Sequence, residues 1–130
     1  MKKTRVAAYC RASRGSAEPE HSLKAQADFY KEMICSTPSF QFAGIHAEIA
    51  SGLNTKHRSE FRKLLQDCKK STVDLIFTKS VSIFARNTID FLNAIRQPRS
   101  WGVDVYFENE RILLSKERTE TAMSIYAAFM

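Results

Sequence analysis

The sequence predicts an α/β fold in which an open, mostly parallel sheet of four to five strands is covered by helices on both faces. Along the chain, short apolar runs alternate with segments whose apolar residues recur at helical spacing, which is the pattern of a parallel sheet with crossover helices. A length of 130 residues fits one domain with its own core. Hydrophobic residues make up 44% and charged residues 26%, as in ordinary globular proteins.

Four apolar segments predict the strands of this sheet. The first is the run Val6-Ala7-Ala8-Tyr9-Cys10, and residues 11–15 are expected to form the loop after it. The second strand is marked by Phe40, Phe42 and Ile45, and a polar loop is expected at residues 51–56. The third and fourth are residues 73–77 and 103–107.

Four stripes of apolar residues at helical spacing predict the helices. We expect Ser22 to cap the first helix, because Glu18-Pro19-Glu20-His21 breaks the pattern, and residues 36–39 to end it. We expect Pro98 to end the third helix. The four stripes are Leu23, Ala27, Tyr30 and Ile34; Phe61, Leu64, Leu65 and Cys68; Ile89, Leu92 and Ile95; and Ala122, Ile125, Tyr126 and Phe129. The last stripe runs to the end of the chain without a capping residue, so we expect a long helix that is cut short.

Cysteine and histidine usage argues against disulfides and metal sites. The three cysteines (Cys10, Cys35 and Cys68) form no Cys-x-x-Cys pair, and the three histidines have no metal-ligand spacing. We expect Cys10 and Cys68 to be small buried residues. No apolar run approaches the roughly 18 residues of a membrane span, and the basic N-terminus lacks a cleavage site, so a cytoplasmic location is expected.

The charge balance favours a polyanionic partner. Lys and Arg number 20 against 14 Asp and Glu, a formal net charge of +6. Such an excess suits DNA, because basic side chains neutralise phosphates and release counterions. Many basic domains bind no nucleic acid, so charge alone does not decide the function.

The carboxyl ends of parallel strands are where reactive groups gather, and two loops are nominated by this rule. After the first strand, Ser13 lies between Arg11 and Arg14. After the third strand come Lys79, Ser80, Ser82 and Arg86. A hydroxyl among guanidinium groups suits phosphoryl transfer, because the cations neutralise the transition-state charge while the hydroxyl attacks. Serine is also common in loops as a turn former, so the pattern alone leaves both interpretations open.

Several motifs resemble those of the serine site-specific recombinases, the resolvase and invertase family. The pattern Tyr9-Cys10-Arg11-Ala12-Ser13 is similar to the family's active-site signature, and it is followed in order by four further markers. These are Ser22-Leu23-Lys24-Ala25-Gln26, Ser51-Gly52 with Arg58 and Phe61, residues 79–88, and residues 103–110. The Lys-Ser-x-Ser pattern at residues 79–82 is most similar to the large serine recombinases of phages and conjugative transposons. The resemblance covers nearly the whole chain.

The resemblance implies a mechanism and partners. Ser13 would attack a DNA phosphodiester, leaving a 5′-phosphoserine bond and a free 3′-hydroxyl. Arg11, Arg58 and Arg86 match positions that bind the scissile phosphate, Gln26 matches a position that supports the site, and Ser82 matches that of a polar helper. The covalent bond conserves the phosphodiester energy, so no metal or nucleotide cofactor is implied. The partners implied are double-stranded DNA and further copies of the protein, as dimers and tetramers.

The resemblance also implies that residues 1–130 are a catalytic domain and that the DNA-binding region lies outside this chain. At one position the chain departs from the family pattern: Ile83 follows Ser82 where the family carries a phosphate-binding arginine. Losing such a donor costs on the order of 3 kcal/mol of transition-state stabilisation. One alternative is therefore an impaired member that acts as a DNA-associated or dimerising module. A second is a flavodoxin-like domain that binds phosphates or nucleotides.

Overall fold

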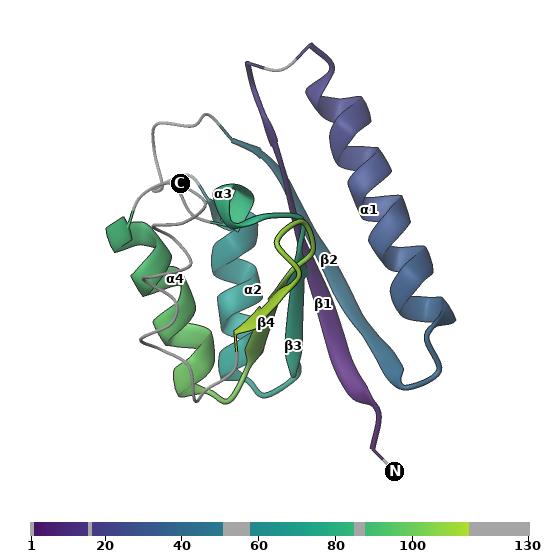
Figure 1. Cartoon of the computed structure of the whole chain (residues 1–130), viewed down its shortest axis with the longest axis vertical. Coiled ribbons are helices and arrows are strands. Elements are labelled where there is room, and N and C mark those ends of the chain that lie inside the picture. Colours follow the sequence, from purple (N-terminus) through teal and green to yellow (C-terminus); the bar gives the residue numbers. More distant parts are fainter. Residues whose placement is uncertain (1, 16, 51–57, 85–87, 115–130) are drawn as a thin grey trace.

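The computed structural model describes residues 2–15, 17–50, 58–84 and 88–114, and it contains one five-stranded sheet. The strands lie in the order β2-β1-β3-β4-β5, with β1 to β4 parallel and β5 antiparallel to β4 (Figure 1). Their bounds are β1 Thr4–Ser13, β2 Phe40–Ala50, β3 Leu75–Thr78, β4 Asp104–Phe107 and β5 Ile112–Leu114. The predicted fold class is confirmed.

Helices cover both faces of the sheet, as predicted. Helix α1 lies on one face, and α2 and α4 lie on the other (Figure 1). A short helix, α3, follows β3. The bounds are α1 Pro19–Ser36, α2 Ser59–Lys69, α3 Val81–Phe84 and α4 Thr88–Ser100.

The interior strand β1 divides the core in two. Its residues 6–10 are fully buried, because consecutive side chains of a strand point to opposite faces and both faces are covered. Ala7 and Tyr9 join the core under α2 and α4, whereas Val6, Ala8 and Cys10 join the core under α1. The predicted burial of Cys10 and Cys68 is confirmed. Burial raises the pKa of each of these two thiols to about 12.

A bulge in β2 sets the register between β2 and β1. Val6 pairs with Phe42 but Ala7 pairs with Gly44, so Ala43 is an extra residue on β2. Gly44 has a φ of 123°, a conformation that residues with a side chain rarely adopt. After the bulge, Tyr9 pairs with His46 and Arg11 with Glu48.

Two predicted helix ends are wrong, and proline is the reason in each case. Helix α1 begins at Pro19 rather than after Ser22, because proline, with its fixed φ and missing N–H, is well suited to the first helical turn. Helix α4 continues past Pro98 to Ser100. The Pro98 carbonyl accepts hydrogen bonds from the backbone N–H groups of Trp101 and Val103, which close the turn after the helix.

Both predicted strand-end loops are also partly regular structure. Strand β1 continues through residues 11–13, because β2 pairs with it as far as Ala50. The loop after β3 contains α3. The expected loop at 51–56 and the last helix stripe at 122–129 lie outside the described residues. Within the described ranges, no helix has the length and apolar character that crossing a membrane requires.

Candidate active site

Ser13 is the last residue of β1 and its side chain is exposed. Its Oγ accepts a hydrogen bond of 3.2 Å from the backbone N–H of Gly15. Because side chains alternate along a strand, Tyr9, Arg11 and Ser13 project from the same face of β1, the face covered by α2. The hydroxyl thus lies at the carboxyl edge of the sheet, where the strand-end rule predicts reactive groups.

Arg58 is a buried cation on this face. It directly precedes α2, and only 3% of its surface is exposed. Its Nε donates a hydrogen bond of 3.2 Å to the Tyr9 hydroxyl. Its Cζ lies 5.1 Å from the ring centroid of Tyr9 and 4.0 Å from that of Phe61. The electron-rich faces of two rings offset part of the cost of burying the charge.

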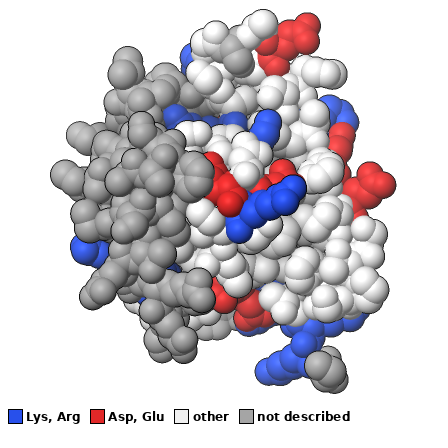
Figure 2. Space-filling view, viewed as in Figure 1, with Lys and Arg blue, Asp and Glu red and all other residues white. Residues whose placement is uncertain are grey.

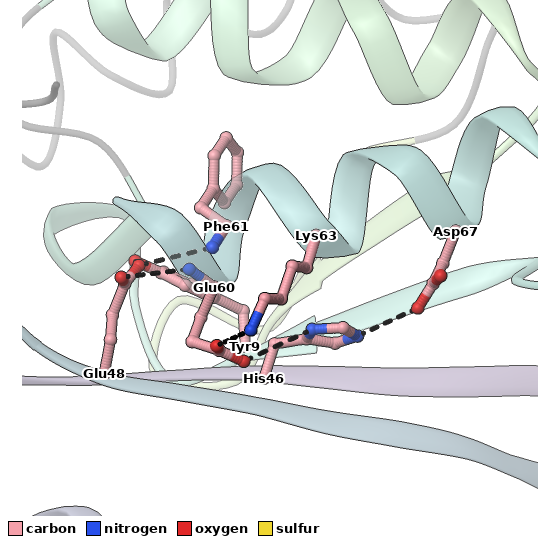
Figure 3. A network of polar contacts seen from close by, with 7 residues as sticks. All are labelled: Tyr9, His46, Glu48, Glu60, Phe61, Lys63 and Asp67. Atoms are coloured by element: carbon pink, nitrogen blue, oxygen red, sulfur yellow. Dashed lines mark hydrogen bonds and ion pairs between the residues drawn. The ribbon is translucent and has the colours of Figure 1, made fainter. Parts of the chain in front are cut away.

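Glu48 on β2 links Tyr9 to the beginning of α2. Its Oε2 accepts a hydrogen bond of 2.5 Å from the Tyr9 hydroxyl, and its carboxylate accepts the backbone N–H groups of Glu60 and Phe61 at 3.2 and 3.3 Å (Figure 3). The N-cap residue Arg58 makes no side-chain capping bond, so Glu48 satisfies these N–H groups in its place. Burial raises the pKa of Tyr9, which keeps the phenol protonated as a donor.

Glu48 is not among the site residues predicted from the sequence, although a signal is present there. From Ile45 to Ile49 the residues alternate between apolar and polar, which is the period of a half-buried strand. Extending the second strand along this alternation would have placed His46 and Glu48 together on one face. Their partners on α2 lie more than ten residues away, so the hydrogen bonds themselves could not have been predicted.

Arg11 connects β1 to α1 and α3. Its Nη1 donates a hydrogen bond of 3.4 Å to the carbonyl of Ile83, and its own carbonyl accepts 3.3 Å from Gln26 Nε2. This contact with α3 follows from the sheet, because β1 and β3 are parallel neighbours and their carboxyl ends meet at one edge. Gln26 therefore lies beside the backbone of Arg11, and Arg11 and Arg58 lie on the same side of β1.

Ser80, Ser82 and Ile83 form the turn at the start of α3. Ser80 is buried, and its Oγ lies 3.0 Å from Ser82 Oγ and accepts the N–H of Ile83 at 3.3 Å. Ser82 is exposed. Ile83 is half-buried and packs against the core under α2 and α4. The third predicted arginine, Arg86, lies outside the described residues. Of the three, the structure places Arg11 and Arg58 on the same side of β1.

The described residues include no group of three or more His, Cys, Asp and Glu side chains arranged to hold a metal ion. Among the residues that the structure describes, the basic side chains form no single patch on the face in view. On that face, Lys and Arg side chains lie next to Asp and Glu side chains (Figure 2). Net charge alone therefore does not outline a DNA-binding surface there.

Comparison with solved structures shows the same fold in several recombinases. A resolvase family site-specific recombinase from Streptococcus pneumoniae aligns with a TM-score of 0.74 and 25% identity, covering 97% of this chain and 87% of the other. The N-terminal catalytic domain of TP901-1 integrase aligns with a TM-score of 0.71 and 18% identity, covering 96% and 92%. A serine recombinase from Sulfolobus solfataricus aligns with a TM-score of 0.58 and 23% identity, covering 95% and 81%.

Comparison with curated proteins finds no match. Comparison with protein families finds a match to the family described as "Resolvase, N terminal domain" over residues 6–130. This match spans every strand and helix of the described ranges except the first two residues of β1. The chain therefore belongs to the resolvase family, where it corresponds to the N-terminal catalytic domain of serine recombinases.

Proposed function

We propose that this domain cleaves and rejoins double-stranded DNA in site-specific recombination, with Ser13 as the nucleophile. The observation that carries the proposal is the position of Ser13, exposed at the end of β1 on the face that also holds Arg11 and Arg58. Family membership supplies the reaction class. Integration by a large serine recombinase is the finer form of this proposal, and it rests on the pattern of residues 79–82.

In the proposed reaction, Ser13 Oγ forms a bond to the scissile phosphorus while the bond to the 3′-oxygen breaks. The serine proton leaves Oγ, and the departing 3′-oxygen takes up a proton to become a hydroxyl. The DNA 5′ end remains attached as a phosphoserine ester. Rejoining reverses these steps with a 3′-hydroxyl from another strand, so the number of phosphodiester bonds is unchanged.

In this proposal the arginines bind the scissile phosphate, and other residues support them. Arg11 and Arg58 bind the non-bridging phosphate oxygens, with Arg86 as a third ligand, and so stabilise the charge of the transition state. Gln26 holds the backbone of Arg11 in place. Ser82 on α3 supports the reaction as a polar side chain. The subunits assemble into dimers and tetramers on DNA.

A second candidate function is a DNA-associated or dimerising module with impaired chemistry, and Ile83 favours it. The position carries no cation, and the Ile83 side chain packs against the core. The Ile83 carbonyl still holds Arg11. An arginine at this position would restore a guanidinium donor next to Arg11.

Covalent trapping separates these two functions. The protein is incubated at low salt, where phosphate contacts are strongest, with a library of random duplexes, and protein attached to DNA is isolated under denaturing conditions. We expect a 5′-linked adduct that Ser13→Ala abolishes and that Ser39→Ala, at an exposed serine distant in sequence, leaves unchanged. An adduct formed only by Ile83→Arg establishes the impaired member. If neither the natural protein nor Ile83→Arg forms an adduct, the proposed activity is wrong.

A further inference from the structure

His46 on β2 lies between two carboxylates of α2 (Figure 3). Only 9% of its surface is exposed. Its Nε2 lies 3.2 Å from Asp67 Oδ2, and its Nδ1 lies 3.8 Å from Glu60 Oε1. Glu60 is in the first turn of α2 and Asp67 is in the last, two turns apart on the same side. One imidazole ring therefore contacts side chains from both the first and the last turn of the helix.

The positions of the two nitrogens fit an imidazolium better than a neutral ring. The 3.2 Å contact is that of a hydrogen bond from Nε2–H to Asp67. Nδ1 is buried and has no hydrogen-bond partner among the described residues. In a neutral ring with Nε2 protonated, Nδ1 would present its lone pair to the Glu60 carboxylate. In an imidazolium, Nδ1 carries a proton and attracts that carboxylate, so both carboxylates become partners.

Arg58 directly precedes this helix, and a second contact from β2 holds the first turn of the helix. Glu48 lies two residues after His46 on the same face of β2 and binds the backbone N–H groups of Glu60 and Phe61. Together with the contact between His46 and Asp67 in the last turn, this contact holds both ends of α2 against β2. Because Arg58 directly precedes α2, the tilt of the helix sets where the guanidinium lies.

The other charged and titratable groups around His46 are already engaged. Lys63 on α2 is 66% exposed at its side chain and binds Glu60 Oε2 at 3.0 Å. Tyr9, the β1 neighbour of His46, donates to Glu48 and accepts from Arg58. Apolar packing of Phe61, Leu64 and Cys68 also holds α2, but it does not depend on protonation.

We propose that His46, in its protonated form, is a positioning residue that locks α2 to the sheet and so fixes Arg58 for phosphate binding. This inference rests on the proposed role of Arg58 in DNA cleavage. The lock is present when His46 is protonated and is lost as the pH rises and the ring becomes neutral. The site thus gains a dependence on pH that neither serine nor arginine would give it.

The lock itself can be measured without DNA, by NMR on the whole chain. The Arg58 Nε resonance, assigned with Arg58→Lys, is followed from about pH 5 to about pH 8, across the range in which histidines titrate. We expect it to shift together with the ring proton of His46, and to stay constant in His46→Gln, which keeps a donor for Asp67 but cannot become charged. Asp67→Asn should also reduce the shift. The exposed His21 provides the control, His21→Gln.

The proposed lock is wrong if the Arg58 Nε resonance moves equally in the natural protein and in His46→Gln, or if it does not move at all in the natural protein.

The rate of covalent adduct formation tests the consequence of the lock for catalysis. We expect the rate at saturating DNA to fall about fivefold or more as the pH rises from about 5 to about 8. In His46→Gln the rate should be low at every pH. If His46→Gln keeps the natural pH profile of the adduct rate, the positioning role of His46 is refuted, but the proposed chemistry of Ser13 is not. If no adduct forms at all, the proposed function is refuted. The NMR result still shows whether protonation of His46 changes the position of Arg58.

Discussion

Arg58 is held against Tyr9 both by a hydrogen bond from Nε to the hydroxyl, at 3.2 Å, and by its position 5.1 Å from the ring centroid. The hydroxyl in turn donates to Glu48, so one phenol joins a buried cation to a carboxylate on the next strand. Tyr9 is part of the motif that resembles the family's active-site signature, and this arrangement gives a physical reason for a tyrosine at that position. A phenylalanine could stack on Arg58 but could not bridge it to Glu48.

Tyr9→Phe should therefore weaken both stability and chemistry. Removing the hydroxyl leaves the buried Glu48 and Arg58 with one partner fewer, at a cost of about 1–3 kcal/mol in the free energy of unfolding. Urea denaturation measures this cost, and we expect the adduct rate to fall about tenfold or more, because Arg58 is less well placed. The half-buried Tyr106 provides the control, Tyr106→Phe. A natural adduct rate in Tyr9→Phe would show that the bridge does not matter.

The ion pair of Arg5 and Asp74 should make stability depend on pH at the acidic end. Asp74 accepts hydrogen bonds from the side chain and backbone of Arg5, and these hold its pKa below the usual value. The stabilisation is present above the unfolded pKa of about 3.9 and is lost as the pH falls through the lower folded value. Asp74→Asn should lower the urea midpoint at about pH 7 and have a smaller effect at about pH 3.

The effect of Asp74→Asn should be modest, because both side chains are more than a third exposed and solvent screens the pair. The matched control is Asp28→Asn, which removes an exposed pair with Lys24 within one helix. We expect that control to change the midpoint less at either pH. An Asp74→Asn effect that grows as the pH falls would contradict the lowered pKa.

Cysteine reactivity should follow burial. Cys10 and Cys68 are fully buried with pKa values raised to about 12, whereas Cys35 is exposed near the end of α1. Because the thiolate is the reactive form, iodoacetamide at about pH 8 should modify Cys35 alone in the folded protein. Mass spectrometry should find all three cysteines modified once the chain is unfolded. Rapid modification of Cys10 in the folded protein would contradict the packing of β1 between two covered faces.

Leu64 should be a major contributor to the docking of α2. It is fully buried between α2 and the sheet, so Leu64→Ala should cost about 2–5 kcal/mol in the free energy of unfolding. The control is Leu113→Ala on the edge strand β5, where the side chain is 47% exposed and the cost should stay below about 1 kcal/mol. Equal costs at the two positions, measured by urea denaturation, would show that Leu64 does not anchor α2 to the sheet.

Much of the fold follows from local sequence patterns. The apolar run at residues 6–10 predicted a strand buried on both faces, and the stripe of Phe61, Leu64 and Cys68 predicted the buried side of α2. The ends of helices were harder to predict. Pro19, for example, is compatible both with a break in the helical pattern and with the first turn of a helix. The short strand β5 was not located in advance, since three residues with Leu113 exposed give little periodicity.

The site was predictable where it depends on strand ends and motifs, and less so where it depends on long-range contacts. Ser13, Arg11 and Gln26 were named from the sequence, and the structure places Arg11 beside Gln26. The partners of Arg58 include Tyr9, 49 residues away, and Phe61. Glu48 and His46 contact α2 from β2, and the bulge at Ala43 sets their register against β1.

Identification of the DNA-linked residue tests the role of Ser13 most directly. The trapped adduct is digested with trypsin and nuclease, and the peptide carrying the residual nucleotide is sequenced by mass spectrometry. Cleavage after Arg11 and Arg14 releases Ala12-Ser13-Arg14, and we predict that the nucleotide phosphate is attached to the serine of this peptide. A nucleotide on Ser80, Ser82 or any other residue would contradict the assignment of Ser13 as the nucleophile.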